Sequence, residues 1–219
     1  MISVTLSRPW LTVDLARTMR VLSWAPLNPG FTMARRIAWR EVRNADLPEG
    51  FDALRWLGAE ARAAGQGDAV VMLTSRDVAT CRVTRAEAGG IVAQAVATVG
   101  LSNAEAVGRR LPWHSADFGT INVAAVLGAG LTRAAQVEAM SLAAEARTAA
   151  VMEAGWRIAT GIATGTGTDC IALACDPGRG RHAGLHTDAG EALGAAVRGA
   201  VAAGVADWLA WRRARVAEG

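Results

Sequence analysis

The chain of 219 residues contains no lysine and no tyrosine. All 23 of its basic residues are arginine, and they face 20 acidic residues, so the formal net charge is only +3. Without a lysine amine the chain has no means to form a Schiff base or to use lysine as a general base. Apart from a C-terminal cluster (Arg212, Arg213 and Arg215) the arginines are scattered, so we expect no nucleic-acid partner.

Cysteines and membrane-spanning patterns are also scarce. Cys81, Cys170 and Cys175 are an odd number without a CxxC pair, which argues against a disulfide framework and favours a reducing, cytoplasmic location. The start, MISVTLSRPW, lacks the basic region and apolar core of a signal peptide. The uncharged stretch from Ile121 to Thr132 is too short for a membrane helix of about 20 residues, so we expect no membrane partner.

Hydrophobic residues make up 52% of the chain, which is enough for a sizeable core, and the length fits one domain, 1–219. Alternating apolar residues predict strands in the N-terminal third, and apolar runs predict buried strands later. The predicted strands lie at 2–6, 10–15, 20–25, 36–42, 69–75, 90–100 and 120–128.

Helical spacing appears at 51–65, at 131–155 and from Asp188 onward. In the second helix we expect Thr132 as the N-cap, Gly155 as the stop, and one apolar face that carries Val137, Met140, Ala144 and Val151. Strands first, then strands mixed with long helices, predict an α/β (α+β) fold with a mixed sheet covered by helices. The last helix, with Trp208 and Trp211 near its end, suggests a possible homo-oligomer interface.

The segment ATGTGTDCIALACDP, residues 163–177, carries the most unusual pattern. As one strand over 164–175 it would place Thr164, Thr166 and Thr168 on one face, and two glycines and Asp169 on the other. A backbone left bare at Gly165 and Gly167 beside a carboxylate would admit a large ligand. A bulge, with Asp169 capping a neighbouring helix, explains the same pattern.

Two further loops combine polar and aromatic residues. In ATVGLSNAEAVG, Ser102 and Glu105 form a capping box, so the segment is either an ordinary strand-to-helix turn or, with Asn103, a cradle for an amide oxygen. In SWAPLNPGF, Trp24 and Asn28 lie in a proline-rich loop, where the indole is either a core side chain or a platform for a flat ligand.

Histidines are few, and two of them lie close together in RHAGLHTDAGE. His182 and His186 are four residues apart, but Gly184 between them argues against the continuous helix that metal binding at this spacing needs. We therefore expect no metal site. His186, just before a predicted helix, is a candidate acid or base, or a ligand for an anion.

Seven segments, in this order, resemble the adenosylcobinamide amidohydrolases, enzymes of corrinoid salvage. The resemblance runs from Val21 to Val201 and is carried by VLSWAPLNPGF, VMLTSRD, ATVGLSNAE, GTINVAAVL, AAEARTAAVMEAG, ATGTGTDCIALA and AGLHTDAGEALGAAV. It implies hydrolysis of the amide between aminopropanol and a corrin propionate, giving adenosylcobyric acid and 1-aminopropan-2-ol. The corrinoid, with its cobalt, is then the substrate, and no cofactor is required. A non-catalytic corrinoid carrier or sensor is the alternative.

A corrin ring is wide and flat and carries many amide arms, which fits the residues above. We expect substrate contacts from Trp24, Asn28, Ser75, Arg76, Asn103, Thr164, Gly165, Thr166 and Gly167. For amide hydrolysis the interpretation assigns Asp169 or Glu145 as base and His186 as acid, with Asn122 or backbone N–H groups on the oxyanion. A threonine nucleophile, Thr166 or Thr168, is the rival scheme.

Overall fold

The computed structural model describes residues 1–43, 46, 50–110, 112 and 119–217. Three helices and twelve strands are assigned within these residues. In chain order they are β1 (Ser3–Ser7), β2 (Trp10–Ser23), β3 (Gly30–Glu41), α1 (Ala53–Ala63), β4 (Val70–Thr74), β5 (Arg82–Ala88), β6 (Ile91–Val99), β7 (Ala104–Glu105), β8 (Ile121–Leu131), α2 (Arg133–Glu153), β9 (Arg157–Ile158), β10 (Gly161–Ile162), β11 (Gly165–Thr166), β12 (Cys170–Pro177) and α3 (Asp188–Ala217).

Seven strands form one continuous path in the order β4-β3-β2-β12-β8-β6-β5, and β1 pairs with the first half of β2. The pairs β3–β4 and β8–β12 are parallel, and the other neighbours are antiparallel, so the sheet is mixed. The mixed α/β fold expected from the sequence is confirmed.

The sheet bends where β2 is interrupted by a bulge. The register of β2 against β3 shifts between Asp14 and Met19, and Ala16 within this stretch has φ +63°. A bulge bends and twists its strand, and here it turns β1, β4 and the adjoining parts of β2 and β3 under the rest of the sheet. The sequence predicted two strands, 10–15 and 20–25, where the structure has one bulged strand.

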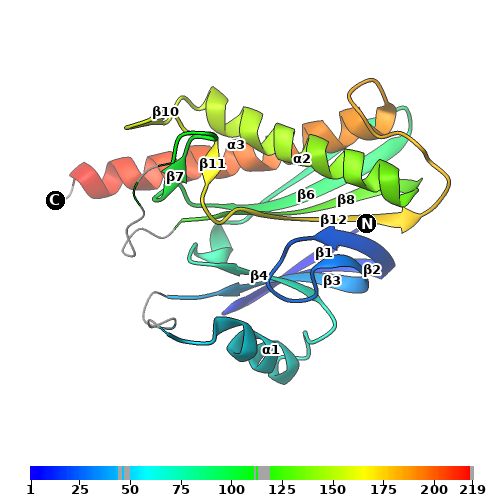
Figure 1. Ribbon diagram of the computed structural model, residues 1–219, viewed down its shortest axis with the longest axis horizontal. Coiled ribbons are helices and arrows are strands. Elements are labelled where there is room, and N and C mark those ends of the chain that lie inside the picture. The colour runs from blue at the N-terminus through cyan, green and yellow to red at the C-terminus, as the bar shows by residue number, and fades with distance from the viewer. Residues whose placement is uncertain (44–45, 47–49, 111, 113–118, 218–219) are drawn as a thin grey trace.

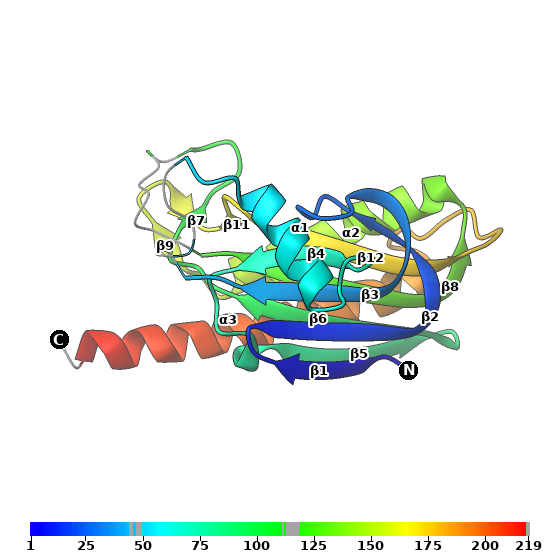
Figure 2. The same cartoon turned by 90° about the horizontal axis from the view of Figure 1, so that it is seen from below.

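The bend produces layers, which Figure 1 shows edge-on and Figure 2 shows from below. Helices α2 and α3 cover one side of β12, β8, β6 and β5 with a large apolar core. A second core fills the space between the two parts of the sheet, and α1 packs on the outer side of β3 and β4.

Helix α2 begins and ends at the predicted residues. The Thr132 hydroxyl accepts a bond from the Ala135 N–H, and Gly155 follows the last turn with φ +65°. Its buried face, however, consists mainly of small residues, among them Ala139, Ala143 and Ala150. Of the four residues expected on one apolar face, Val151 is buried and Met140 and Ala144 are half-buried, whereas Val137 is 54% exposed.

Helix α3 is long and apolar enough, over Asp188–Arg215, to meet the criteria for a membrane-crossing helix, but half of its most apolar window is buried inside the fold. Its inner face packs on β5, β6, β8 and α2. Trp208 is 1% exposed and contacts Trp156 edge-on, with ring centroids 5.2 Å apart. Trp208 is therefore a core residue, whereas Trp211 is 40% exposed, and the homo-oligomer interface at this helix stays a prediction.

One buried polar side chain connects α2 to the sheet. The Gln136 amide is fully buried; its oxygen accepts from Arg20 Nε at 2.5 Å, and its nitrogen donates to the carbonyls of Arg20 and Leu173 at 3.0 and 2.9 Å. Gln136 thus joins α2 to both β2 and β12.

We expect Gln136→Leu to lower the free energy of unfolding by about 3 kcal/mol, because it leaves two buried carbonyls and the Arg20 Nε–H without the Gln136 amide as partner. Glu153→Gln is the control on the same helix: it removes an exposed ion pair with Arg198 and should cost less than about 1 kcal/mol. Urea unfolding of both variants measures the difference, and equal losses would contradict the assigned role.

Candidate active site

The Asp169 carboxylate lies at the start of β12 and is 5% exposed. Oδ1 accepts from the Ile121 N–H at 2.9 Å and from the Thr166 hydroxyl at 2.5 Å. Oδ2 accepts from the Thr166 N–H at 3.0 Å and from Arg147 Nη1. A carboxylate has about four acceptor positions, so Asp169 is fully occupied.

These bonds close a turn where the sequence predicted a continuous strand over 164–175. β11 covers only Gly165–Thr166 and pairs with β7, and β12 begins after a turn at 167–168. A Cβ on Gly165 would lie 2.5 Å from Asp169 Oδ2, so glycine is needed there to let the carboxylate fold back. The alternative of an irregular segment with a bonded Asp169 was the better interpretation, although the carboxylate closes this turn and does not cap a helix.

Six of the seven segments that carry the family resemblance meet around this turn. The Trp24 indole N–H donates to the Asp169 carbonyl at 2.8 Å, and the Asn122 amide donates to the Leu73 carbonyl at 2.7 Å. β7, from the third segment, pairs with β11, and Arg147 enters from α2. The seventh segment, with His186, follows the opposite end of β12.

Several predicted site residues have their polar groups committed to the fold. Asn122 is fully buried, with its oxygen bonded by the Thr120 hydroxyl, so its amide does not reach a ligand as an oxyanion donor. The Thr168 hydroxyl donates to the Gly119 carbonyl at 3.0 Å. Thr164 bonds the Val107 N–H and the Glu105 carbonyl, and Asn28 donates to the Gly67 and Ala69 carbonyls.

Other predicted residues keep groups that a ligand can contact. Trp24 is 50% exposed, Ser75 is exposed, and no described atom lies within 4 Å of a Cβ built on Gly167. Asn103 Oδ1 is buried without a hydrogen-bond partner among the described residues. The Arg76 guanidinium lies 5.1 Å from the Trp211 ring centroid, and burial lowers its pKa from the ordinary value.

The capping box at Ser102 does not open a helix. Ala104–Glu105, which were expected in its first turn, form β7. The strand pairing with β11 takes the place of a helix, because residues 104–105 pair with 165–166 and the Glu105 carbonyl accepts from the Thr164 N–H; the local bond from the Ala104 N–H to the Leu101 carbonyl closes only a turn. Of the cradle predicted here for an amide oxygen, Asn103 is the side chain whose role stays a prediction.

Glu145 and His186 come together, but in a separate pocket on the outer side of α2. This pocket has a volume of about 420 Å³, and Glu138, Ser141, His182 and Thr187 also line it. The Glu138 carboxylate accepts from the Ala183 N–H at 2.7 Å and anchors the loop before α3. None of Thr166, Asp169 and Arg147 lines this pocket, and His186 follows the end of β12 opposite to Asp169. The structure therefore does not bring His186 to Asp169.

Arg147 is the site residue that the sequence reasoning missed. It lies two residues beyond Glu145, which places it about 200° around the helix, so it points under α2 while Glu145 points to solvent. Besides Asp169 it bonds the Thr148 hydroxyl at 3.2 Å. A stripe of alanines on the buried face would have indicated this orientation.

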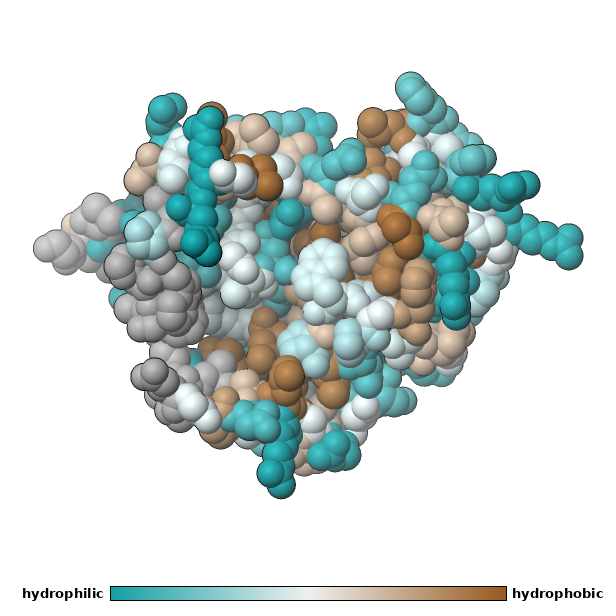
Figure 3. Space-filling view, viewed as in Figure 1, coloured by the Kyte–Doolittle hydropathy of each residue, from teal (hydrophilic) through white to brown (hydrophobic). Residues whose placement is uncertain are grey.

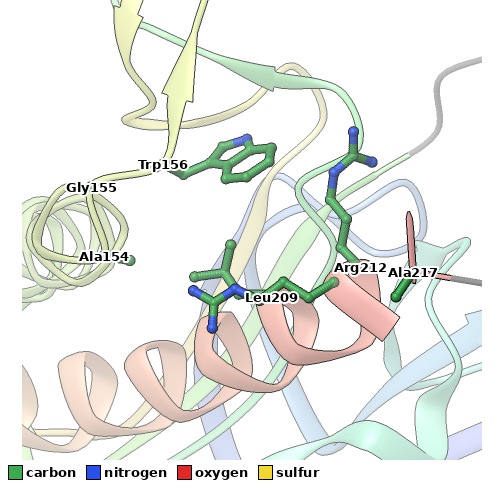
Figure 4. A pocket seen from close by; sticks show the side chains of 7 residues that line it. Ala154, Gly155, Trp156, Leu209, Arg212 and Ala217 are labelled. Carbon is green, nitrogen blue, oxygen red and sulfur yellow. The ribbon is translucent and has the colours of Figure 1, made fainter. Parts of the chain in front are cut away.

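A larger cavity, of about 490 Å³, lies between the ends of α2 and α3 (Figure 4). Trp156, Leu209 and Arg212 point into it, and the Arg212 guanidinium stacks 5.4 Å from the Trp156 ring centroid. It contains none of the predicted site residues. Within the described residues, no group of three or more histidine, cysteine, aspartate or glutamate side chains is placed to hold a metal ion.

Comparison with known proteins decides the family. The model of the adenosylcobinamide amidohydrolase family matches residues 2–213. This chain belongs to the adenosylcobinamide amidohydrolase family. It is 37% identical over 153 residues, 66% of its length, to a protein of Halobacterium salinarum named adenosylcobinamide amidohydrolase. The match spans 62% of that relative's length. The resemblance seen in the seven segments is thereby confirmed.

The buried pair of Asp169 and Arg147 predicts strong coupling. We expect Asp169→Asn alone to cost about 3–5 kcal/mol, because it leaves the Arg147 guanidinium, 18% exposed, without its charge partner. Adding Arg147→Met should recover part of this loss. Chemical denaturation of the two single variants and the double variant measures the coupling energy.

The exposed pair of Arg17 and Asp176, with side chains 57% and 37% exposed, is the control for this cycle. Its coupling should stay below about 1 kcal/mol. A coupling at Asp169 no larger than this would refute the role of the pair in closing the turn.

Cys170 next to Asp169 offers a pH test. Burial raises the pKa of this thiol to about 11, and the nearby Asp169 charge adds to the effect. The unfolded thiol ionises near pH 9.0, so between pH 9 and 11 the unfolded state loses a proton that the folded state keeps. Stability from this group is full below pH 9 and is lost as the pH rises toward 11.

We therefore expect Cys170→Ala to flatten the decline of the unfolding free energy between pH 9 and 11, by up to about 3 kcal/mol in total. The measurement is denaturation of wild type and variant across this range. At pH 7.5 the buried thiol is protonated and a poor nucleophile, so parallel pH profiles, or loss of activity in Cys170→Ala at neutral pH, would contradict this assignment.

Proposed function

We propose that this chain hydrolyses the amide between 1-aminopropan-2-ol and the corrin propionate of adenosylcobinamide. The products are adenosylcobyric acid and the free amine, and the reaction serves corrinoid salvage. The observation that carries the proposal, beside family membership, is the meeting of six characteristic segments around Thr166, Asp169 and Arg147.

The hydrogen bonds of Asp169 favour one of the two schemes drawn from the sequence. A carboxylate with four donors and 5% exposure has no acceptor position left for a free water molecule. The Thr166 hydroxyl oxygen lies 2.5 Å from Asp169 Oδ1, so its proton is the one that Asp169 is placed to accept. This geometry supports Thr166 as nucleophile and Asp169 as its base.

Thr166 is the better nucleophile candidate of the two threonines. Its hydroxyl faces a carboxylate, and the residue is partly exposed. The Thr168 hydroxyl instead donates to a backbone carbonyl, a far weaker base. The role of Arg147 is to position Asp169, since it bonds the oxygen that does not face the Thr166 hydroxyl.

The proposed reaction then has two halves. Thr166 Oγ1 attacks the amide carbon while its proton passes to Asp169, and the C–N bond breaks as that proton moves to the leaving nitrogen. The amine departs and an ester joins Thr166 to the corrin side arm. Water hydrolyses the ester, releasing the carboxylic acid and restoring the threonine hydroxyl. Asp169 relays the proton from Thr166 to the leaving amine and water supplies the rest, so the scheme requires no resident cofactor.

We expect Thr166→Val to reduce aminopropanol release at least about 1,000-fold, because it removes the nucleophile. Thr166→Ser should keep measurable turnover, and Thr168→Val should retain activity within about tenfold. The assay is incubation with adenosylcobinamide, followed by mass analysis of the corrinoid and quantitation of the amine.

The same assay separates the alternatives. If Glu145→Gln and His186→Ala lose turnover while Thr166→Val stays active, the reaction takes place in the pocket on the outer side of α2 and not at Thr166. Recovery of intact adenosylcobinamide from the wild-type protein would favour the carrier or sensor.

A further inference from the structure

An apolar surface lies beside α2, on the face of the sheet that α2 covers. It consists of the exposed Trp24, Phe31 and Met33 and the half-buried Leu22, and we call it the apolar shelf. Trp24, Phe31 and Met33 are 50%, 38% and 55% exposed. Leu22 pairs with Phe31 in the register of β2 and β3, and Phe31 and Met33 are two residues apart, so all three project from one face.

Contacts with α2 fix which face this is. Arg20 pairs with Met33 across the two strands, and its side chain donates to Gln136 of α2. The guanidinium groups of Arg20 and Arg133 lie 5.9 and 5.3 Å from the Phe31 ring centroid. The Phe31 ring is thus held beside the first turn of α2. Figure 3, in the orientation of Figure 1, shows apolar side chains in patches among hydrophilic ones, with long hydrophilic side chains projecting at the outline of the molecule.

The apolar shelf continues into the cluster around Asp169. Trp24 follows the last residue of β2, and its indole N–H is bonded to the Asp169 carbonyl. The same bond orients the ring. A molecule lying on Phe31 and Trp24 therefore has its edge next to the turn that contains Thr166.

The dimensions suit a broad, flat ligand. Residues two apart on a strand are separated by about 7 Å, and neighbouring strands by about 4.8 Å. Large apolar side chains exposed together, with polar groups at the border, are typical of binding surfaces. Here the border carries Arg133 on one side and Thr166 on the other.

We infer that the apolar shelf binds the flat face of the corrin macrocycle while one side arm reaches Thr166. This assignment rests on the proposed function. Apolar contact with the ring would supply affinity, and the arm alone, without the ring, would bind weakly. Phe31 and Met33 thus act on substrate binding and not on the bond-breaking step.

The test compares two substrates in the double variant Phe31→Ala/Met33→Ala. With adenosylcobinamide we expect KM to rise at least about tenfold and kcat to change less than about threefold. With N-(2-hydroxypropyl)propanamide, which has the reacting amide but no ring, the variant should equal wild type in kcat/KM. Leu54→Ala, at a side chain 61% exposed on α1, is the matched control and should leave both substrates unaffected.

A thermal melt checks folding, and Met33→Ala alone serves if the double variant is unstable. Unchanged KM for adenosylcobinamide, or an equal loss with both substrates, would overturn the inference. Binding of adenosylcobyric acid, followed by its visible absorbance, separates this failure from failure of the proposed function. If wild type binds this corrinoid and the double variant does not, the inference that the apolar shelf binds the corrin ring is supported even where no hydrolysis is seen. Equal binding by both proteins would refute it.

Discussion

The arrangement of the candidate site depends on a single buried carboxylate with a complete set of donors. Asp169 receives bonds from β8, from its own turn and from α2, so three elements distant in the sequence are fixed relative to one another. Burying a charge is unfavourable unless it is paired and hydrogen-bonded, and here both conditions are met. The cost of leaving any of these donors without an acceptor explains why glycine precedes Thr166: a side chain at residue 165 would push the carboxylate away.

The polar residues around Asp169 fall into two groups, those whose hydrogen bonds are made within the fold and those that keep atoms at the surface. Asn122, Thr120 and Thr168 bond to backbone carbonyls and to one another, and they join the ends of β4, β8 and β12. Thr166, Trp24 and Ser75 keep atoms at the surface. A rigid inner layer of this kind holds an outer layer in a fixed geometry, as catalysis by positioned groups requires.

The sequence predicted the element types well and their connections poorly. The strands at 69–75, 90–100 and 120–128 and the three helices follow from apolar periodicity, which acts locally. The strand pairing of residues 104–105 depends on partners about 60 residues away, and the turn at 167–168 depends on bonds from Asp169 to Arg147 and Ile121, 22 and 48 residues away, which periodicity does not report. Asp169 and Trp24 were recognised as unusual residues, but Arg147 was not. Its direction depends on which face of α2 is buried, and that face is defined by alanines, which carry little hydropathy signal compared with Val137 and Met140.

The first half of β3 lies at an edge of the sheet. Gly30–Ala34 pair with β2, whereas the pairing of β4 with β3 begins at Ile37, so among the described residues this margin of the sheet has a strand neighbour on one side only. Side chains on this edge that project from the sheet face into solvent, such as Met33, contribute little to the core. If the apolar shelf binds a macrocycle as inferred above, exchange of these side chains can change which macrocycle is accepted while the groups around Asp169 are preserved.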